Sequence, residues 1–364
     1  MNNDLLYQVA LTQVQQIGDV HTRILINTFG EAAAIFKAPL KKLETIEGIG
    51  RKRAQAIKSF HAFPDCEKEL AFIEKYKIRP LFITDDNYPK RLLNCYDSPS
   101  LLYFRGTANL NAAKILSIVG TRSHSEYGKQ VCEKLLAELE AKDILIVSGL
   151  AFGIDTIAHR NALKNGFQTV GVLAHGLDRI YPSQNKFLAK QMLEYGGLLT
   201  DFKSETNPDK QNFPKRNRIV AGLCDALIVV ESSVKGGSII TAELANSYNK
   251  DVMAYPGRSN DIKSEGCNFL IRKNKASLVT SAADIMEMMN WDQPVKPKVA
   301  QRELFSDLNT EEQLIVNLLA IQPTHIDELY VKTNLSSSTT ANALLMLEMR
   351  NIISALPGKI YQLC

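Results

Sequence analysis

Between residues 113 and 288, short apolar runs alternate with amphipathic segments, and this alternation constrains the fold more than any other feature of the chain. The predicted strands end at Val119, Val147, Leu173, Val230 and Tyr255. Segments of helical periodicity follow the first four of them. Continuous apolar strands separated by helices are typical of a parallel sheet covered on both faces. We therefore expect an α/β domain whose ligand binds beyond the carboxyl ends of these strands.

Two further strands are predicted ahead of this region, at Arg79–Ile83 and Leu101–Phe104, so the sheet domain is expected to span residues 77–290. Residues 291–306 hold the only tryptophan and two prolines, and they predict a linker. Residues 307–364 contain three predicted helices and a hairpin, the pattern of a winged helix. Its third helix begins with polar but uncharged residues, which favours protein interaction or dimer stabilisation over recognition of DNA.

Residues 1–76 have helical periodicity and predict an all-α domain. Within it, Gly48 and Gly50 form a predicted tight turn between two helices, and Arg51 and Lys52 begin the second helix. This is the pattern of a helix-hairpin-helix (SAM-like) domain, in which glycines let the backbone approach a DNA phosphate. The four residues are therefore candidates for a secondary DNA contact. The alternative is a small interaction domain that keeps the hairpin only for folding.

Three loops at the expected binding edge carry glycine and hydroxyl residues, and two of them add a basic residue. They are Gly120-Thr121-Arg122-Ser123, Ser148-Gly149 and Lys235-Gly236-Gly237-Ser238. Glycines let a phosphate reach the backbone, amides at a helix start bind it, and cations neutralise it. Neither GxGxxG nor GxxxxGK[ST] is present, so the sequence favours neither a dinucleotide cofactor nor nucleotide hydrolysis. Several phosphate-type loops on one edge favour a nucleic-acid strand over one mononucleotide.

A fourth predicted loop, from Pro208 to Arg218, is both basic and aromatic. Its candidate binding residues are Lys210, Phe213, Lys215, Arg216 and Arg218, and no acidic residue interrupts them. Basic side chains neutralise phosphates, and an aromatic ring stacks on an unpaired base, which is worth about 1–3 kcal/mol per base. The alternative is that Phe213 is a core residue and some arginines pair with acids, Arg218 above all.

Asp155 and His159 lie four residues apart on a predicted helix and share one face of it. They could bind a metal, act in acid–base chemistry, or hold the preceding loop through a hydrogen bond. Two ligands are too few for a metal site and no third is evident, so we favour the structural role. The sequence accordingly predicts no catalytic residue, metal site or cofactor.

The net charge of +4 excludes a histone-like polycation but permits a local basic groove. The six cysteines, none at CxxC spacing, predict reduced thiols in a cytoplasmic protein; they are Cys66, Cys95, Cys132, Cys224, Cys267 and Cys364. Met1-Asn2-Asn3-Asp4 lacks the features of a signal peptide, and no stretch approaches the roughly 18 apolar residues that a membrane span needs. We therefore expect a cytoplasmic protein without a membrane segment.

Between Ser117 and Ile271, a series of ordered blocks closely resembles the DNA-processing protein A family (DprA, also called Smf). The blocks are SIVGTRSHSEYG, SGLAFGIDTIAH, GLDRIYPSQN, NFPKRNRIVAGL, KGGSIITAELA, YPG and SEGCNFLI. The resemblance covers nearly the whole chain. It implies an extended Rossmann-like domain that binds single-stranded DNA as a homodimer. It also implies protection of incoming strands and loading of the RecA recombinase on them during natural transformation and recombination.

Carried over by position, the resemblance implies a DNA pocket formed by Arg122, Ser148, Gly149, Lys210, Phe213, Arg216, Arg218 and Lys235. Family members commonly have arginine where this chain has Phe152, and glutamate where it has Asp201. The competing hypothesis is a Rossmann-like phosphoribohydrolase, which would use a PGGxGT loop and a catalytic glutamate. This chain has Gly236-Gly237-Ser238 and Glu243 but no such proline-led loop. A nuclease would need two or three clustered acids.

Overall fold

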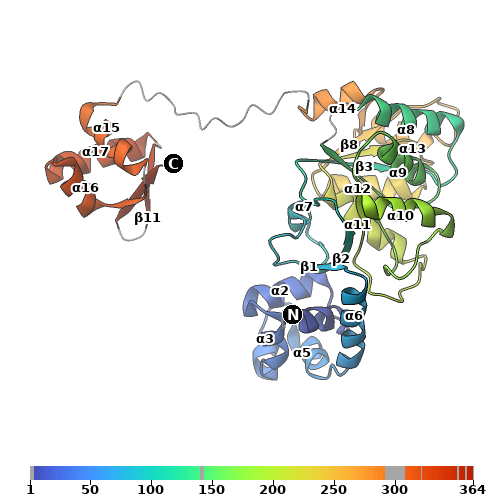
Figure 1. Ribbon diagram of the computed structural model, residues 1–364, viewed down its shortest axis with the longest axis horizontal. Coiled ribbons are helices and arrows are strands. Elements are labelled where there is room, and N and C mark those ends of the chain that lie inside the picture. The colour runs from blue at the N-terminus through green and yellow to red at the C-terminus, as the bar shows by residue number, and fades with distance from the viewer. Residues whose placement is uncertain are drawn as a thin grey trace. The chain divides into compact units, whose positions relative to one another are not determined.

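The computed structural model describes residues 4–139, 143–291, 308–320, 322–350, 352–356 and 359–363. The chain divides into two compact units, 1–292 and 293–364 (Figure 1). The predicted linker at 291–306 lies outside the described residues, except for Trp291.

The first unit is built around a nine-stranded sheet in the order β1-β2-β6-β5-β4-β3-β7-β8-β9. The strands are β1 (Arg79–Phe82), β2 (Leu101–Gly106), β3 (Lys114–Val119), β4 (Ile144–Ser148), β5 (Thr169–Val172), β6 (Gly196–Thr200), β7 (Ala226–Val229), β8 (Asp251–Ala254) and β9 (Ser277–Leu278). Along this order, every pair of neighbouring strands from β6 through β3 to β9 is parallel, whereas β1 and β2 add an antiparallel edge next to β6. The predicted parallel α/β sheet is confirmed.

Helices cover both faces of this sheet. They are α7 (Lys90–Leu93), α8 (Glu126–Glu138), α9 (Ile154–Lys164), α10 (Lys186–Glu194) after a short 3-10 turn (Ser183–Asn185), α11 (Asn212–Leu223), α12 (Gly237–Ser247), α13 (Glu265–Arg272) and α14 (Ala282–Met288). Side chains of β3 alternate between the two cores: Ile115 and Val119 belong to the cluster with α11 and α12, and Leu116 and Ile118 to that with α8 and α9. Burial on both faces explains why the strand has no polar alternation.

The strand β6 was not predicted from the sequence, because Gly196-Gly197 weakens a strand pattern. The structure shows why glycine is needed there. Gly196 has a φ of +147°, and a Cβ on Gly106 of β2 would overlap the Gly196 carbonyl. The two backbones therefore approach more closely than side chains would permit, and β6 joins the antiparallel edge to the parallel sheet.

The prediction of a loop through residues 208–218 is wrong for its second half, because α11 begins at Asn212. Pro214 lies in the first turn of this helix, where a missing N–H removes no helical hydrogen bond. Ile219, Val220 and Leu223 then anchor the helix in the core. Phe213, Lys215, Arg216 and Arg218 therefore lie on a helix and not in a loop, whereas Lys210 precedes that helix.

The N-terminal helices form a separate layer that lies beside β1 and β2 (blue in Figure 1). They are α1 (Leu5–Gln13), α2 (Asp19–Phe29), α3 (Ala32–Lys37), α4 (Leu40–Glu44), α5 (Gly50–Lys58) and α6 (Phe63–Lys75). The predicted hairpin joins α4 to α5, and its glycines Gly48 and Gly50 have φ values of +82° and +59°. Arg53 donates to the carbonyls of Gln16 and Gly48 and so ties this hairpin to the turn before α2.

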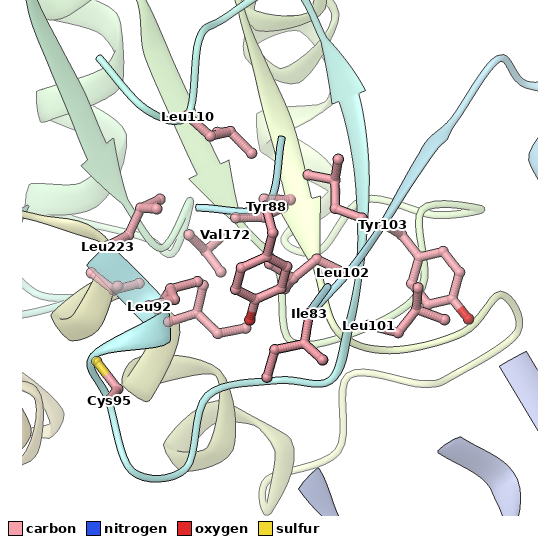
Figure 2. Packing of buried hydrophobic residues seen from close by; sticks show 14 of the residues in the cluster. Ile83, Tyr88, Leu92, Cys95, Leu101, Leu102, Tyr103, Leu110, Val172 and Leu223 are labelled. Atoms are coloured by element: carbon pink, nitrogen blue, oxygen red, sulfur yellow. The ribbon is translucent and has the colours of Figure 1, made fainter. Parts of the chain in front are cut away.

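A hydrophobic cluster connects this layer to the sheet through the segment between β1 and β2. Figure 2 shows the ring of Tyr88 beside Leu92 and Ile83, with Val172 of β5 and Leu223 of α11 nearby. Tyr88 is fully buried, and its hydroxyl donates to the carbonyl of Pro99. Polar contacts reinforce the junction, since the carboxylate of Glu69 on α6 accepts from the amide of Ser204 at 3.0 Å.

The second unit has the three helices and the hairpin that the sequence predicted. Its elements are α15 (Thr310–Leu319), β10 (Thr324–His325), α16 (Ile326–Thr333), α17 (Ser337–Met349), β11 (Ile353–Leu356) and β12 (Ile360–Leu363). The strands form a small sheet in the order β10-β12-β11 around a core that includes Ile315, Leu329, Leu344 and Ile353. The winged-helix prediction is confirmed.

Candidate nucleic-acid interface

A pocket of about 390 Å³ opens at the carboxyl ends of β3 and β7. These two strands are neighbours at the point where the strand order changes direction. From β3 the chain adds β4, β5 and β6 on one side of the sheet, and it then adds β7, β8 and β9 on the other side. Ligands of open parallel sheets bind at such switch points. The pocket is lined by Val119, Gly120, Thr121, Arg122, Gly149, Ala151, Asp155, Phe213, Pro214, Arg216, Asn217, Val220, Ser232, Ser233, Gly236, Gly237, Ser238, Ile240 and Thr241.

One wall of the pocket is the start of α12. Gly236 precedes the helix, and Gly237 and Ser238 are its first two residues. The first amides of a helix have no acceptor within it and carry partial positive charge, so they favour an anion. A Cβ on Gly237 would meet no atom within 4 Å, so this position at the pocket wall is open. The hydroxyl of Ser238 donates to that of Ser232 at 2.7 Å and so fixes the helix start to the end of β7.

Arg122 forms the opposite rim from the loop after β3. The loop is fixed by Glu231, whose carbonyl accepts from the Thr121 amide at 2.7 Å and whose carboxylate accepts from the Ser125 amide at 2.9 Å. The exposed guanidinium of Arg122 lies 4.8 Å from the ring centroid of Phe213. This distance suits a cation–π contact, which holds the cation at the pocket mouth.

Arg216 forms the floor of the pocket and is only 4% exposed. Its Nη1 donates to the carbonyls of Gly149 and Val172, and a Cβ on Gly149 would collide with its guanidinium. Burial lowers the pKa of Arg216 to about 10, against the opposing effect of Asp155, so the group remains charged at neutral pH. A buried cation with carbonyl partners retains positive charge that a phosphate could neutralise.

The structure brings eight of the thirteen predicted site residues to this one pocket: Gly120, Arg122, Gly149, Phe213, Arg216, Gly236, Gly237 and Ser238. Lys210, Lys215 and Lys235 are exposed and do not line it. Ser148 is buried, and its hydroxyl donates to the carbonyl of Ile118 at 2.6 Å. The roles of all thirteen in DNA binding stay predictions.

Arg218, the remaining predicted residue, lies outside the pocket lining and faces two carboxylates. Its Nη2 lies 2.7 Å from Asp201 Oδ2 and 2.9 Å from Asp19 Oδ2 of α2, and its Nη1 donates to the carbonyl of Asp97. Burial acts to lower the pKa of Arg218, but the two carboxylates outweigh it and raise that pKa above its ordinary value. The guanidinium thus joins α11 to the N-terminal helices, as the alternative of acid pairing anticipated.

The hydroxyl of Thr121, from the first predicted phosphate-type loop, also lines the pocket, and so do three hydroxyl residues that were not predicted: Ser232, Ser233 and Thr241. Two of them could have been found from the sequence, because Ser232 and Ser233 follow β7 after only two residues, at the same edge of the sheet as the glycine-rich loops. In the predicted secondary site, Gly48, Gly50, Arg51 and Lys52 are all exposed at the hairpin between α4 and α5.

Asp155 and His159 lie one turn apart on α9 but have different surroundings. Asp155 lines the pocket, whereas His159 is fully buried behind it and lies 2.7 Å from Thr169 Oγ1 through Nδ1. Burial, with a smaller contribution from Arg216, lowers the pKa of His159 to about 3. This geometry favours a structural role for His159.

The buried imidazole predicts a loss of stability in acid. Below its unfolded pKa of 6.5, His159 binds a proton in the unfolded chain but remains neutral in the fold until about pH 3. Its stabilising contribution is therefore complete above 6.5 and is lost as the pH falls. Urea unfolding at about pH 7 and about pH 5 should show a decrease some 2 kcal/mol larger for the wild type than for His159→Asn. Equal pH dependence in both proteins would contradict the assignment.

In the part of the chain that the structure describes, no group of three or more His, Cys, Asp or Glu residues is placed to hold a metal ion. No helix in that same part is both long and apolar enough to cross a membrane. Five cysteines in the described residues are buried free thiols, and Cys364 lies outside those residues.

Three known domain families match the chain in order. Residues 9–60 match a SAM-like helix-hairpin-helix tandem, residues 79–290 match the family described as DNA recombination-mediator protein A, and residues 300–359 match the DprA winged helix domain. These matches agree with the fold predicted for each part.

Individual relatives extend the similarity over the whole chain. Protein Smf of Synechocystis is 30% identical and covers 99% of both chains, and DprA of Streptococcus pneumoniae is 39% identical over 61% of this chain and 82% of that one. The X-ray structure of the S. pneumoniae protein superposes with a TM-score of 0.66 at 34% identity, over 79% of this chain and 98% of that one. A structure of DprA from Helicobacter pylori, described for its single-stranded DNA binding mode, has a TM-score of 0.54 at 31% identity, over 60% of this chain and 98% of that one.

Proposed function

The chain belongs to the DNA recombination-mediator protein A family, as the resemblance predicted, and on that premise we propose that it binds single-stranded DNA without cleaving it and loads RecA recombinase on the strand. One observation carries the proposal: the switch-point pocket combines free helix amides, two arginines and a partly exposed aromatic ring. The relative from H. pylori, described for its single-stranded DNA binding mode, supports this choice of ligand.

The ring of Phe213 is the feature that favours an unpaired strand over duplex DNA. Phosphates are present in both forms, so Arg122 and Arg216 alone do not distinguish them. A ring at the pocket rim stacks only on a base that is not already stacked in a helix. Phe213 projects from the first turn of α11 and contacts the cation of Arg122, so its position is fixed before the ligand arrives.

Binding without catalysis is supported by the surroundings of the acidic residues. Glu243, the counterpart considered for a phosphoribohydrolase glutamate, does not line the pocket and lies 2.9 Å from Lys275. Asp155 is the pocket's acidic side chain within the described ranges, and it lies among Arg216 and backbone amides. We propose a cytoplasmic homodimer that protects incoming strands and acts in natural transformation and recombination.

The outer domains are assigned supporting roles in this proposal. The hairpin of Gly48, Gly50, Arg51 and Lys52 would add a secondary DNA contact. In the winged helix, α17 exposes Leu345, Met346 and Met349, which supports a contact with protein more than with phosphate.

Binding and loading are tested separately. Fluorescence anisotropy with single-stranded and duplex oligonucleotides should show a preference for the single strand and a linear decrease of log affinity with log salt concentration. RecA filaments should then form faster on strands precoated with single-strand-binding protein when this chain is added. Turnover of a nucleoside monophosphate or cleavage of the oligonucleotide would instead favour an enzyme.

Phe213→Ala is expected to lower the affinity for single-stranded DNA by about tenfold, because one stacked base contributes about 1–3 kcal/mol. The salt dependence should remain that of the wild type, since no charge is removed. Arg122→Ala provides the contrast, because loss of one phosphate contact should reduce the salt slope by about 0.7. Equal effects of both variants on the slope would contradict the assigned roles.

A further inference from the structure

Two exposed aromatic rings continue from Phe213 away from the pocket. Tyr181 lies with its ring centroid 6.0 Å from that of Phe213, at an interplanar angle of 60°. Phe152, in the loop after β4, joins Tyr181, Phe213 and Arg122 around a small adjoining cleft. Phe152 is 41% and Tyr181 44% exposed. We call Phe152 and Tyr181 the aromatic shelf.

The shelf is continuous with the switch-point pocket. Five residues line both the pocket and the adjoining cleft: Arg122, Gly149, Ala151, Phe213 and Arg216. A strand whose phosphate lies near the two arginines therefore has its next bases within reach of the shelf. The cleft itself has a volume of only about 10 Å³. That is roughly the space of one water, so a base would lie across the exposed ring faces and not between them.

Both rings are held by rigid backbone. Gly153, directly after Phe152, has a φ of +78°, and a Cβ there would collide with the Thr121 carbonyl. The amide of Tyr181 donates to Nε2 of the buried His175, 3.2 Å away, and the Nδ1 of His175 lies 2.8 Å from the Gly176 carbonyl. The shelf therefore needs little ordering when a ligand binds, which favours affinity.

Exposure of an aromatic ring is not by itself a sign of binding. Phe187 on α10 is 73% exposed and does not line either cavity. What distinguishes Phe152 and Tyr181 is their place beside two cations at a polyanion pocket. Cations attract the phosphates of a flexible strand, and its unpaired bases then need apolar faces.

We propose that the aromatic shelf stacks unpaired bases of the same strand whose phosphates occupy the pocket. This inference rests on the proposed single-strand binding and adds Phe152 and Tyr181 as base-contacting residues. Stacking would lengthen the bound segment without reading its sequence, because every base has a stacking face.

The test compares a normal oligothymidylate with a strand of equal length in which abasic linkers replace the bases. Phe152→Ala is expected to bind the normal strand about tenfold more weakly than the wild type and the abasic strand equally well. Its salt slope should be unchanged on both ligands. Phe152→Leu, which keeps an apolar side chain, should behave like Phe152→Ala, and Phe152→Tyr should restore binding. Tyr181→Ala should show the same base-dependent loss as Phe152→Ala.

Phe187→Ala is the matched control and should bind both strands as the wild type does. Unchanged binding of the normal strand by Phe152→Ala, or an equal loss on the abasic strand, would overturn the shelf while leaving the proposed function intact. Failure of the wild type to bind either strand would overturn both proposals. Thermal unfolding of each variant confirms that the folded protein is being compared.

Discussion

Gly237→Asp is expected to weaken binding of single-stranded DNA by about 100-fold or more. Gly237 lines the pocket at the first turn of α12, and a Cβ there would meet no atom within 4 Å. A carboxylate would occupy the space before the helix amides and repel a phosphate. Two like charges about 4 Å apart interact with about 4 kcal/mol at an effective dielectric of 20, and each 1.4 kcal/mol is a factor of ten.

The control for this change is Gly237→Asn, which has nearly the same shape and no charge. Its affinity should stay within a few-fold of the wild type. Both variants should unfold at temperatures close to that of the wild type, because an acidic residue near a helix N-terminus is not destabilising. Anisotropy titrations at one fixed salt concentration measure the difference. Similar losses for Asp and Asn would show that shape, and not charge, decides binding at this position.

Arg218→Met is expected to lower the free energy of unfolding by about 3–5 kcal/mol, because it leaves a buried carboxylate without its partner. Asp201 already has one oxygen, Oδ1, that is buried without a hydrogen-bond partner in the structure. Burial raises the pKa of Asp201, and Arg218 partly offsets that effect. Without Arg218 this pKa rises further, so the loss should be largest at neutral pH and should decrease as the pH falls through the raised pKa and the carboxyl is protonated.

Urea unfolding measures this loss, with Lys215→Met as the control on the same helix. Lys215 is exposed, so its replacement should change stability by no more than about 0.5 kcal/mol. The folded Arg218→Met protein should bind single-stranded DNA with nearly unchanged affinity. An intact stability together with a large loss of affinity would instead make Arg218 a DNA contact.

Much of the sheet could be predicted because buried parallel strands leave a clear signal, the uninterrupted apolar runs from β3 to β8. The strand β6 could not, since its glycines serve a close approach between backbones that are distant in sequence. The start of α11 was equally hidden, because Pro214 and its charged neighbours resemble a loop until Ile219 and Leu223 are seen in the core.

In the site, too, features encoded in adjacent residues could be predicted from the sequence, and features that depend on tertiary packing could not. Glycines and a cation before a helix predicted the α12 wall, since that chemistry is encoded in adjacent residues. The different surroundings of Arg216 and Arg218 were not encoded locally. Arg216 donates to backbone carbonyls at the ends of β4 and β5, whereas Arg218 pairs with Asp19 and Asp201 from segments distant in the sequence. Burial of a charge depends on tertiary packing, which the spacing of two arginines does not reveal.

Helix α11 carries Arg216 on the pocket floor and, two residues later, Arg218 at the junction with α2. Because one rigid helix supports both, opening of the N-terminal layer would disturb the floor of the pocket. The layer and the sheet should therefore exchange their most protected amide hydrogens in one cooperative opening. Single-stranded DNA bound at the pocket would therefore slow amide hydrogen exchange in α2 as well, although the DNA contacts no residue of that helix. A ligand stabilises every part of the unit that must be closed for the ligand to bind.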